Sequence, residues 1–180
     1  MLHVAVSTMR NDMRSRLGLL IIILAVLALD QVTKFLVSSN LSLGESISVV
    51  PDFFHFTLVR NSGMAFGLLS AATIPYKPIL VTLLSVVALG AVAIYAISSP
   101  ANERLSQFAL AFILGGAAGN IIDRVRLGYV VDFIDVFYRG SHWPAFNVAD
   151  TAICAGVGLL LLDTLLRPAK ASAEASTGDR

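Results

Sequence analysis

The stretch LGLLIIILAVLALDQVTKFLV, residues 17–37, decides the fold. The hydrocarbon core of a bilayer is about 30 Å thick, and a helix needs about 20 mostly apolar residues to cross it. Arg10, Arg14 and Arg16 precede the stretch, as basic residues precede the core of a signal peptide. The stretch is too long for a signal peptide, however, and its apolar run leads into DQVTK rather than into a small-residue cleavage site. We therefore predict a retained membrane-spanning helix.

Three further stretches are long and apolar enough to cross a bilayer, at residues 77–97, 105–125 and 149–167. The composition agrees, because 56% of the residues are hydrophobic and only 14% are charged. A soluble domain carries about 25% charged residues. A chain with so little charge cannot cover a water-facing surface, so we predict an all-α membrane protein with four transmembrane helices.

The composition also excludes several classes of function. The net charge is +1 and no basic block is present, so no nucleic-acid partner is expected. A single cysteine, Cys154, excludes an internal disulfide and any multi-cysteine metal site. His3, His55 and His142 lack metal-ligand spacing, so we expect neither a metal nor another cofactor.

The number of spans and the positive charges predict the topology. An even number of spans places both termini on one side, and the positive-inside rule makes that side the cytoplasm. The basic residues behind this prediction flank the first and last spans: Arg10, Arg14, Arg16, Arg167 and Lys170. Other arginines fall on the predicted outer side, where each needs a local partner: Arg60, Arg124, Arg126 and Arg139.

This topology divides the chain into three parts. Residues 1–16 form a cytoplasmic N-terminal segment, and residues 17–167 form the membrane domain. Residues 168–180 are small and polar, which predicts a disordered cytoplasmic tail.

Two segments outside the spans, 38–76 and 126–148, lie on the predicted outer side. In the first, Phe54, Phe56 and Leu58 alternate with polar residues, a pattern typical of a short strand with one apolar face. Aromatic residues crowd both segments, as they do at a membrane–water boundary. We predict a small, partly β platform over the outer ends of the helices.

Ionisable side chains gather at the outer end of the spans. Asp30 lies about 20 Å from the cytoplasmic end of the first span, at 1.5 Å per residue. Lys34 follows one helical turn later on the same face, and we interpret the two as a structural ion pair. Asp123 and Arg124 end the third span, and Asp150 opens the fourth.

Two Asn-x-x-Asp units occur at this depth. Asn120 shares a helix face with Asp123, and Asn147 precedes Asp150 by the same three residues. Asp132 lies between the two units in the chain. The small residues of GGAAGN, residues 115–120, allow another helix to approach closely. From the residues alone, a functional and a structural role for this carboxylate cluster stay equally open.

Other polar residues have simpler interpretations. We predict that Asp135 is a solvated loop residue and that Asp163 faces water or Arg167. Cys154 is expected to be a small hydrophobic residue of the core. Gly63 is typical of a turn, although Asn61 beside it could hold a peptide.

Two carboxylates within hydrogen-bond reach have a specific chemistry. They do not both ionise easily, so one holds a proton at neutral pH while the other acts as a base. The base takes a proton from water as the water attacks a peptide carbonyl, and the acid protonates the carbonyl oxygen. Asp132 and Asp150 come from separate segments, as a facing pair requires.

Five blocks carry a resemblance to a known family: DQVTK (30–34), RNSGMAFG (60–67), GGAAGNIIDR (115–124), VVDF (130–133) and FNVAD (146–150). In order and spacing the chain resembles the lipoprotein signal peptidases of bacteria, signal peptidase II, over about residues 17–167. The resemblance implies an intramembrane aspartyl endopeptidase of the bacterial inner membrane, with its site near the outer face. Its substrates would be prolipoproteins in membrane lipid, cleaved on the N-terminal side of a cysteine that carries a diacylglyceryl group. We expect the protein to act as a monomer.

The resemblance also implies residue roles. Asp132 in VVDF and Asp150 in FNVAD would be the catalytic dyad, with Asp123 as the rival for the first role. Asp123 would orient its neighbour Arg124. The groups implied to hold the substrate backbone or the dyad are Asn61, Gly63, Asn120, Arg124 and Asn147, and those implied to brace the first span are Asp30 and Lys34. Met64 departs from the family, which usually has a small residue there.

Two other functions remain as alternatives. A proton-coupled carrier or channel also buries Asp and Lys, but it requires polar residues along a whole helix face. The inner halves of the second and fourth spans have almost none, Asp163 excepted. A serine–lysine peptidase would use Ser62 and Lys34, whose side chains would have to be in contact.

Overall fold

The structure, a computed structural model, describes residues 2–63, 75–101 and 103–166, with the backbone alone for residues 2–15. It contains the helices α1 (Leu2–Asn40), α2 (Lys77–Ser98), α3 (Arg104–Leu127) and α4 (Val148–Leu166). All four are long and apolar enough to cross a membrane, α1 from Arg16 to Asn40. The four predicted spans are confirmed, and α1 extends beyond the predicted span at both ends. Arg167 and the predicted tail, 168–180, lie outside the described residues.

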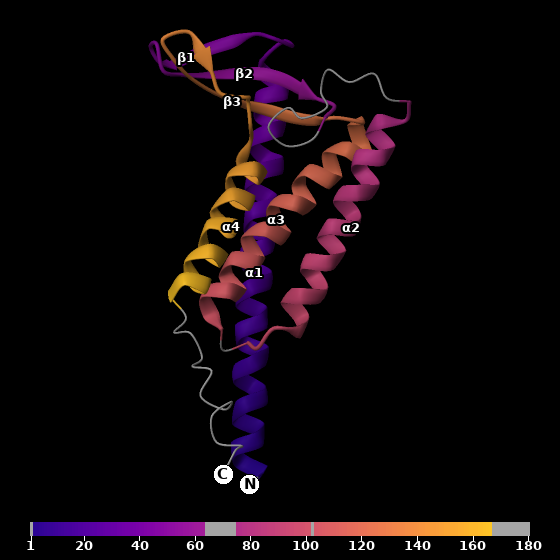
Figure 1. The fold of residues 1–180 in the computed structure, drawn as a ribbon, viewed down its shortest axis with the longest axis vertical. Coiled ribbons are helices and arrows are strands. Elements are labelled where there is room, and N and C mark those ends of the chain that lie inside the picture. The colour runs from indigo at the N-terminus through magenta and orange to yellow at the C-terminus, as the bar shows by residue number, and fades with distance from the viewer. Residues whose placement is uncertain (1, 64–74, 102, 167–180) are drawn as a thin grey trace, which may run out of the picture.

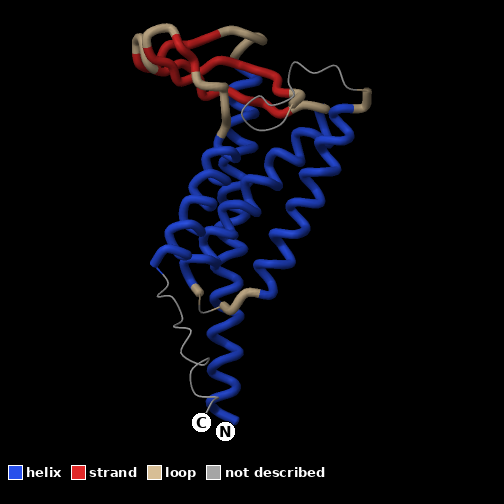
Figure 2. The backbone as a smooth tube through the Cα atoms, viewed as in Figure 1, coloured by secondary structure: helices blue, strands red, loops and turns tan. Residues whose placement is uncertain are grey.

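The predicted platform is a four-stranded antiparallel sheet. Its strands are β1 (Ser46–Val50), β2 (Phe54–Asn61), β3 (Val130–Tyr138) and β4 (Ser141–His142), paired in that order. Figures 1 and 2 show the sheet lying across one end of the helices, with the start of α1 and the last described residues of α4 toward the opposite end. The two segments predicted to lie together on one side of the membrane therefore form a single layer.

The alternating residues of β2 pack as their period predicts. Leu58 is buried with Leu41 and Val131 in a small apolar cluster, and Phe56 packs against it. The register of β2 and β3 pairs Val59 with Asp132 and Asn61 with Val130. This pairing brings the end of β2 beside the aspartate of β3, over the ends of the helices.

Helix α3 is the centre of the bundle and contacts α1, α2 and α4. Its small residues make this possible at the level of the polar cluster. A Cβ added at Gly116 would collide with the carbonyl oxygen of Ala149 on α4, and one added at Gly119 would collide with the carboxylate of Asp30 on α1. The close helix approach predicted from GGAAGN is confirmed.

Three of the outer arginines have local partners. The guanidinium of Arg60 lies 5.0 Å from the ring centre of Tyr129, and that of Arg139 lies 5.2 Å from the ring centre of Tyr138. Such cation–π contacts stabilise by about 0.5–1 kcal/mol at exposed sites. Arg124 donates a hydrogen bond to the carbonyl oxygen of Gly63 at 3.2 Å. Each of these three arginines on the sheet side of the membrane domain therefore has a local partner, as the predicted topology requires.

Candidate active site

The start of α4 fixes the position of Asp150. The Asn147 side-chain oxygen accepts a hydrogen bond from the backbone N–H of Asp150 at 2.9 Å, and Asp150 Oδ2 accepts one from the backbone N–H of Asn147 at 3.3 Å. This reciprocal pair is a capping box, which satisfies backbone donors that a helix start leaves unpaired. The FNVAD block therefore folds locally so that the Asp150 carboxylate lies at the N-terminus of α4.

Asp132 approaches the same point from β3. Its side chain is only 1% exposed. Oδ2 accepts a hydrogen bond from the Asn61 amide at 2.9 Å, and Oδ1 accepts one from the Asn147 amide at 2.7 Å. Asn147 thus contacts both carboxylates, Asp132 through its side chain and Asp150 through its backbone, and it is itself fully buried.

The environment of Asp132 favours its protonated form. Burial and, to a lesser extent, the nearby Asp150 charge raise the pKa of Asp132 to about 7, while the Asn61 and Asn147 hydrogen bonds oppose the rise. Carboxyl groups coupled in this way titrate as a pair. At neutral pH the two aspartates therefore share about one proton.

A second polar cluster lies behind this pair, centred on Lys34. Its ammonium group lies 2.9 Å from Asp30 Oδ2, 3.0 Å from Asp123 Oδ2 and 2.8 Å from the side-chain oxygen of Asn120. The predicted Asp30–Lys34 pair is confirmed. A lysine ammonium has three N–H donors, so all three are used, and no lone pair is left to activate Ser62. These contacts oppose the serine–lysine alternative.

Lys34 also acts on the aspartate pair through Asn120. Because the ammonium binds the Asn120 oxygen, the amide NH₂ is turned the other way, and it donates to Asp150 Oδ1 at 2.8 Å. The remaining oxygen of Asp30 accepts a hydrogen bond from the backbone N–H of Ala149 at 2.9 Å. Through this hydrogen bond, helix α1 fixes the position of the first turn of α4.

Gln31 is a site residue that sequence reasoning missed. Its amide donates to Asp123 Oδ1 at 3.0 Å and, at 3.2 Å each, to Asp30 Oδ2 and the backbone oxygen of Gly119. The signal was present, since Gln31 is a polar residue inside a span and stands in the DQVTK block. A neutral amide attracts less attention than a charge, yet here it donates to two carboxylates that also contact Lys34.

The predicted orientation of Arg124 by Asp123 is wrong. Asp123 accepts hydrogen bonds from Lys34, Gln31 and the backbone N–H of Val131, the last at 3.1 Å. Arg124 instead donates to the backbone oxygens of Gly63 and Asn120. Neighbouring residues on a helix do not face each other, which explains the difference.

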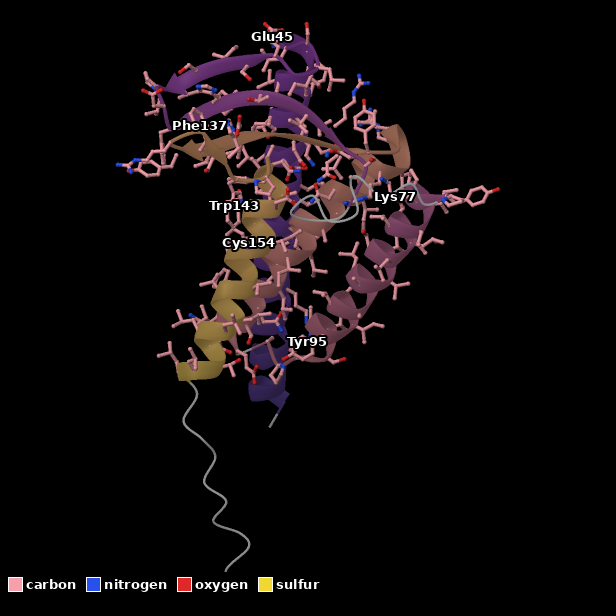
Figure 3. All side chains as sticks on the ribbon, turned by 45° about the horizontal axis from the view of Figure 1, so that its top comes forward. Glu45, Lys77, Tyr95, Phe137, Trp143 and Cys154 are labelled. Carbon is pink, nitrogen blue, oxygen red and sulfur yellow. The ribbon has the colours of Figure 1, made fainter. Side chains whose placement is uncertain are left out.

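Three interpretations of other polar residues also need correction. Asp135 is not a solvated loop residue, because it lies on β3 and is only 9% exposed. It accepts a hydrogen bond from the Thr57 hydroxyl at 3.1 Å and pairs with His142 at 2.8 Å. Cys154 is exposed on α4 rather than buried (Figure 3), because α4 turns that face away from α3. Asp163 accepts a hydrogen bond from Ser106 of α3 at 2.7 Å, while the alternative partner Arg167 lies outside the described residues.

A cleft opens from the aspartate pair into the membrane domain. It has a volume of about 290 Å³ and lies between α2, α3 and α4. Its polar end is formed by Asn61, Asn120, Arg124 and Asp150, and the rest of its wall is mostly apolar. A smaller cavity of about 80 Å³, walled by residues 144–146, shares Asn61, Asp150 and Ile153 with it. The two cavities meet at Asp150.

The distribution of polar groups opposes the carrier alternative. On α3, the residues between Gln107 and Asn120 read FALAFILGGAAG and carry no polar side chain. A transported ion would find no partner along this helix. Among the described residues, no group of three or more His, Cys, Asp or Glu side chains is arranged to hold a metal ion.

The fold and the site define a class: a multi-pass membrane protein with a pair of carboxylates, one buried and one half-buried, at the end of a cleft between its helices. Two solved structures of bacterial membrane enzymes share this fold. One superposes with a TM-score of 0.73 at 32% identity, covering 91% of this chain and 92% of the other. The second has a TM-score of 0.74 at 31% identity, with coverages of 84% and 94%.

Sequence relatives lead to the family. A lipoprotein signal peptidase of Syntrophotalea carbinolica is 49% identical over 145 residues, 80% of this chain and 88% of that protein. One of Syntrophus aciditrophicus is 44% identical over 140 residues, 78% of this chain and 87% of that protein. The family profile of signal peptidase (SPase) II matches residues 22–166. The chain belongs to the signal peptidase II family of membrane proteases, as the five blocks predict.

Proposed function

We propose that this protein is an intramembrane aspartyl endopeptidase that removes the signal peptide from diacylglyceryl-modified prolipoproteins, cutting on the N-terminal side of the lipidated cysteine. The observation that carries the proposal is the pairing of Asp132 and Asp150 on one buried amide residue, Asn147. The pair lies at the polar end of an otherwise apolar cleft, and Asp150 is part of the cleft wall.

The pair performs hydrolysis in two steps. Asp150, which lines the cleft, takes a proton from water as the water oxygen bonds to the scissile carbonyl carbon. Asp132, whose pKa is raised to about 7, gives its proton to the carbonyl oxygen when it is in its protonated form. The resulting diol collapses when Asp150 protonates the leaving nitrogen and Asp132 takes a proton back from a diol hydroxyl, which breaks the C–N bond and restores both groups.

Neighbouring polar groups position the substrate. Arg124 lines the cleft and uses its guanidinium on two backbone oxygens, which leaves further N–H donors for a substrate carbonyl. Gly63 receives one of these bonds and belongs to a turn closed by its own N–H on the Asn61 oxygen at 2.9 Å. These groups hold a peptide across the dyad, a positioning effect that enzymes use to lower the activation barrier.

The cleft favours a lipid-bearing substrate. Its wall beyond the polar end is formed by aliphatic side chains of α2, α3 and α4, such as Leu84, Leu89 and Ile153. Acyl chains on a substrate cysteine would bury apolar surface here, at about 0.8 kcal/mol per CH₂. The proposed setting is the bacterial inner membrane, with both termini in the cytoplasm and the sheet and dyad at the outer face.

The test is cleavage of a purified prolipoprotein, with and without its diacylglyceryl group, by the purified protein. We expect cleavage of the lipidated form alone, inhibition by globomycin (the cyclic peptide inhibitor of this family), and insensitivity to chelators and to Cys154→Ala. Asp132→Asn and Asp150→Asn should abolish turnover. Asp52→Asn, at an exposed aspartate of the turn between β1 and β2, is the matched control and should remain active. Equal cleavage of both substrate forms, or loss of activity with chelator, would refute the proposal.

A further inference from the structure

A second groove lies toward the other end of α2, away from the dyad. It has a volume of about 250 Å³ and is walled by α1, α2 and α3. The side chains that matter for its chemistry are the aliphatic Ile23, Ala96 and Leu114 together with Arg16 and Gln107. Along α3, the groove residue nearest the dyad is Leu114, which lies six residues before Asn120, or about 9 Å at 1.5 Å per residue.

The groove ends at the boundary of the membrane spans. Arg16 is the first residue of the α1 span, Ile97 is next to the last residue of α2, and Gln107 is in the first turn of α3. Three span ends therefore meet beside one cavity. In Figure 3, Tyr95 marks this end of α2 and Lys77 marks the end beside the sheet. A charge here lies at the level of lipid head groups, while the wall beyond it lies at the level of acyl chains.

Arg16 is the cationic group of this groove. It is exposed, and no carboxylate of the described residues lies within 4.0 Å of it. The amide of Gln107, by contrast, is already engaged with the carbonyl oxygens at the end of α2, Ala96 at 3.2 Å and Ser99 at 3.1 Å. The groove thus offers one available positive charge above an apolar wall, which matches a molecule with one anionic head and a hydrocarbon tail.

We propose that this groove binds one anionic glycerophospholipid of the surrounding bilayer, with the phosphate on Arg16 and an acyl chain between α1 and α2. Basic pockets between transmembrane helices are recognised sites for anionic head groups. The site has a mechanical consequence, because α2 packs mainly on α3. The groove residues Ala93 and Ala96 follow Leu89 and Val92 of the cleft wall at a spacing of four residues, so a lipid in this groove packs on the same face of α2, farther along the helix. The proposal does not depend on the peptidase activity.

The experiment measures lipid binding to the purified, delipidated full-length protein by native mass spectrometry. Added phosphatidylglycerol should bind at one high-affinity site, and phosphatidylcholine should bind there more weakly. Arg16→Gln should weaken phosphatidylglycerol binding about fivefold, the effect of about 1 kcal/mol per basic residue at an anionic surface. Arg16→Lys should largely restore it, and Arg126→Gln, at an exposed arginine of the opposite end, should leave it unchanged.

A second pair of variants tests the groove itself and does not rely on the charge. Ala96→Phe fills the groove and should abolish the high-affinity site for phosphatidylglycerol. Ala91→Phe, on an exposed face of α2 that lines neither cavity, should not. Equal binding of the two lipids, or unchanged phosphatidylglycerol binding in both Arg16→Gln and Ala96→Phe, would overturn the proposal.

Discussion

Two pairs of aspartates, all buried except the half-buried Asp150, lie side by side in this protein, and they are held in different ways. Asp30 and Asp123 both contact the ammonium of Lys34, at 2.9 and 3.0 Å. Among the described residues, the hydrogen-bond partners of the Asp132 and Asp150 carboxylates are carboxamides and a backbone N–H group. The first pair has a cation as its counter-charge, whereas the second pair has neutral donors, and burial therefore favours a shared proton there. In the proposed mechanism the same residue type thus provides a brace in one pair and an acid–base group in the other.

The two pairs are nevertheless joined by asparagines. Asn120 accepts from Lys34 and donates to Asp150, and Asn147 donates to Asn120 at 3.2 Å and to Asp132 at 2.7 Å. Each amide has a distinct donor and acceptor end, so the fixed charge of Lys34 sets the direction of the whole chain of hydrogen bonds. The pair bound to Lys34 therefore orients the proposed dyad.

The largest expected difference is in turnover. Asp132→Asn or Asp150→Asn should lower kcat by at least about 10²–10⁴-fold, the contribution of a positioned acid–base group. The double variant should be scarcely worse than either single one, because the two residues act as a unit. Asp123→Asn should keep residual turnover, with an effect partly independent of the dyad. Single-turnover cleavage of a lipidated prolipoprotein by folded variants measures all four. Full activity in Asp132→Asn together with none in Asp123→Asn would reverse the assignment of the pairs.

Removing the cation should act on stability. Lys34→Met leaves Asp30 and Asp123 buried without their counter-charge, which destabilises by about 3–5 kcal/mol in comparable buried pairs. Thermal unfolding in detergent compares this variant with the unsubstituted protein. Adding Asp30→Asn to Lys34→Met should cost less than the sum of the single effects, since one orphaned charge is removed. Strict additivity would show that the pair is not coupled in the folded protein.

The next prediction concerns the close contact between α3 and α1 at Gly119. Gly119→Ala places a Cβ against the carboxylate of Asp30 and should destabilise by about 1–3 kcal/mol, as overpacking does. Gly90→Ala is the matched control on α2, since nothing lies within 4 Å of a Cβ at that position. It should be neutral or slightly stabilising because alanine favours a helix. Equal melting temperatures of the two variants would contradict the described approach of α1 and α3.

The pH dependence of kcat/KM is expected to show a smaller effect, which depends on the pKa of Asp132. Because the pKa of Asp132 is raised to about 7, the dyad loses its proton as the pH rises through that value, and kcat/KM should fall about tenfold per pH unit above it. The Asn61 hydrogen bond lowers the pKa of Asp132, so Asn61→Ala should move this alkaline limb to higher pH. A pH–rate profile of both proteins with lipidated substrate measures the limb. A limb that stays in place, or moves to lower pH, would contradict the stated cause.

The smallest effect belongs to the aspartate far out on the sheet. Asp135 pairs with His142, whose side chain is 53% exposed. Half-exposed pairs contribute about 0–1 kcal/mol, so His142→Ala should change the melting temperature little and leave kcat unchanged. A loss of turnover would show that the platform takes part in catalysis.

The sequence predicted the fold and the residues of the site better than the contacts between those residues. Span length and composition predicted all four helices, and the period of Phe54, Phe56 and Leu58 predicted a strand, because bilayer thickness and pleating impose those patterns directly. The five blocks predicted which polar residues come together. The predicted Asp123–Arg124 contact failed because sequence proximity is not spatial facing on a helix. Asp135 and Cys154 were misplaced for a related reason, since their burial depends on the chain segments that pack beside them.

The central claim is that Asp132 and Asp150 share one proton that the Lys34-bound pair does not hold. Infrared titration of the purified protein in lipid measures this directly, through the carbonyl stretch of a protonated carboxyl group. The account predicts a band that disappears as the pH rises through about 7, that is absent from Asp132→Asn, and that persists in Asp123→Asn. A band that survives in Asp132→Asn and vanishes in Asp123→Asn would contradict it.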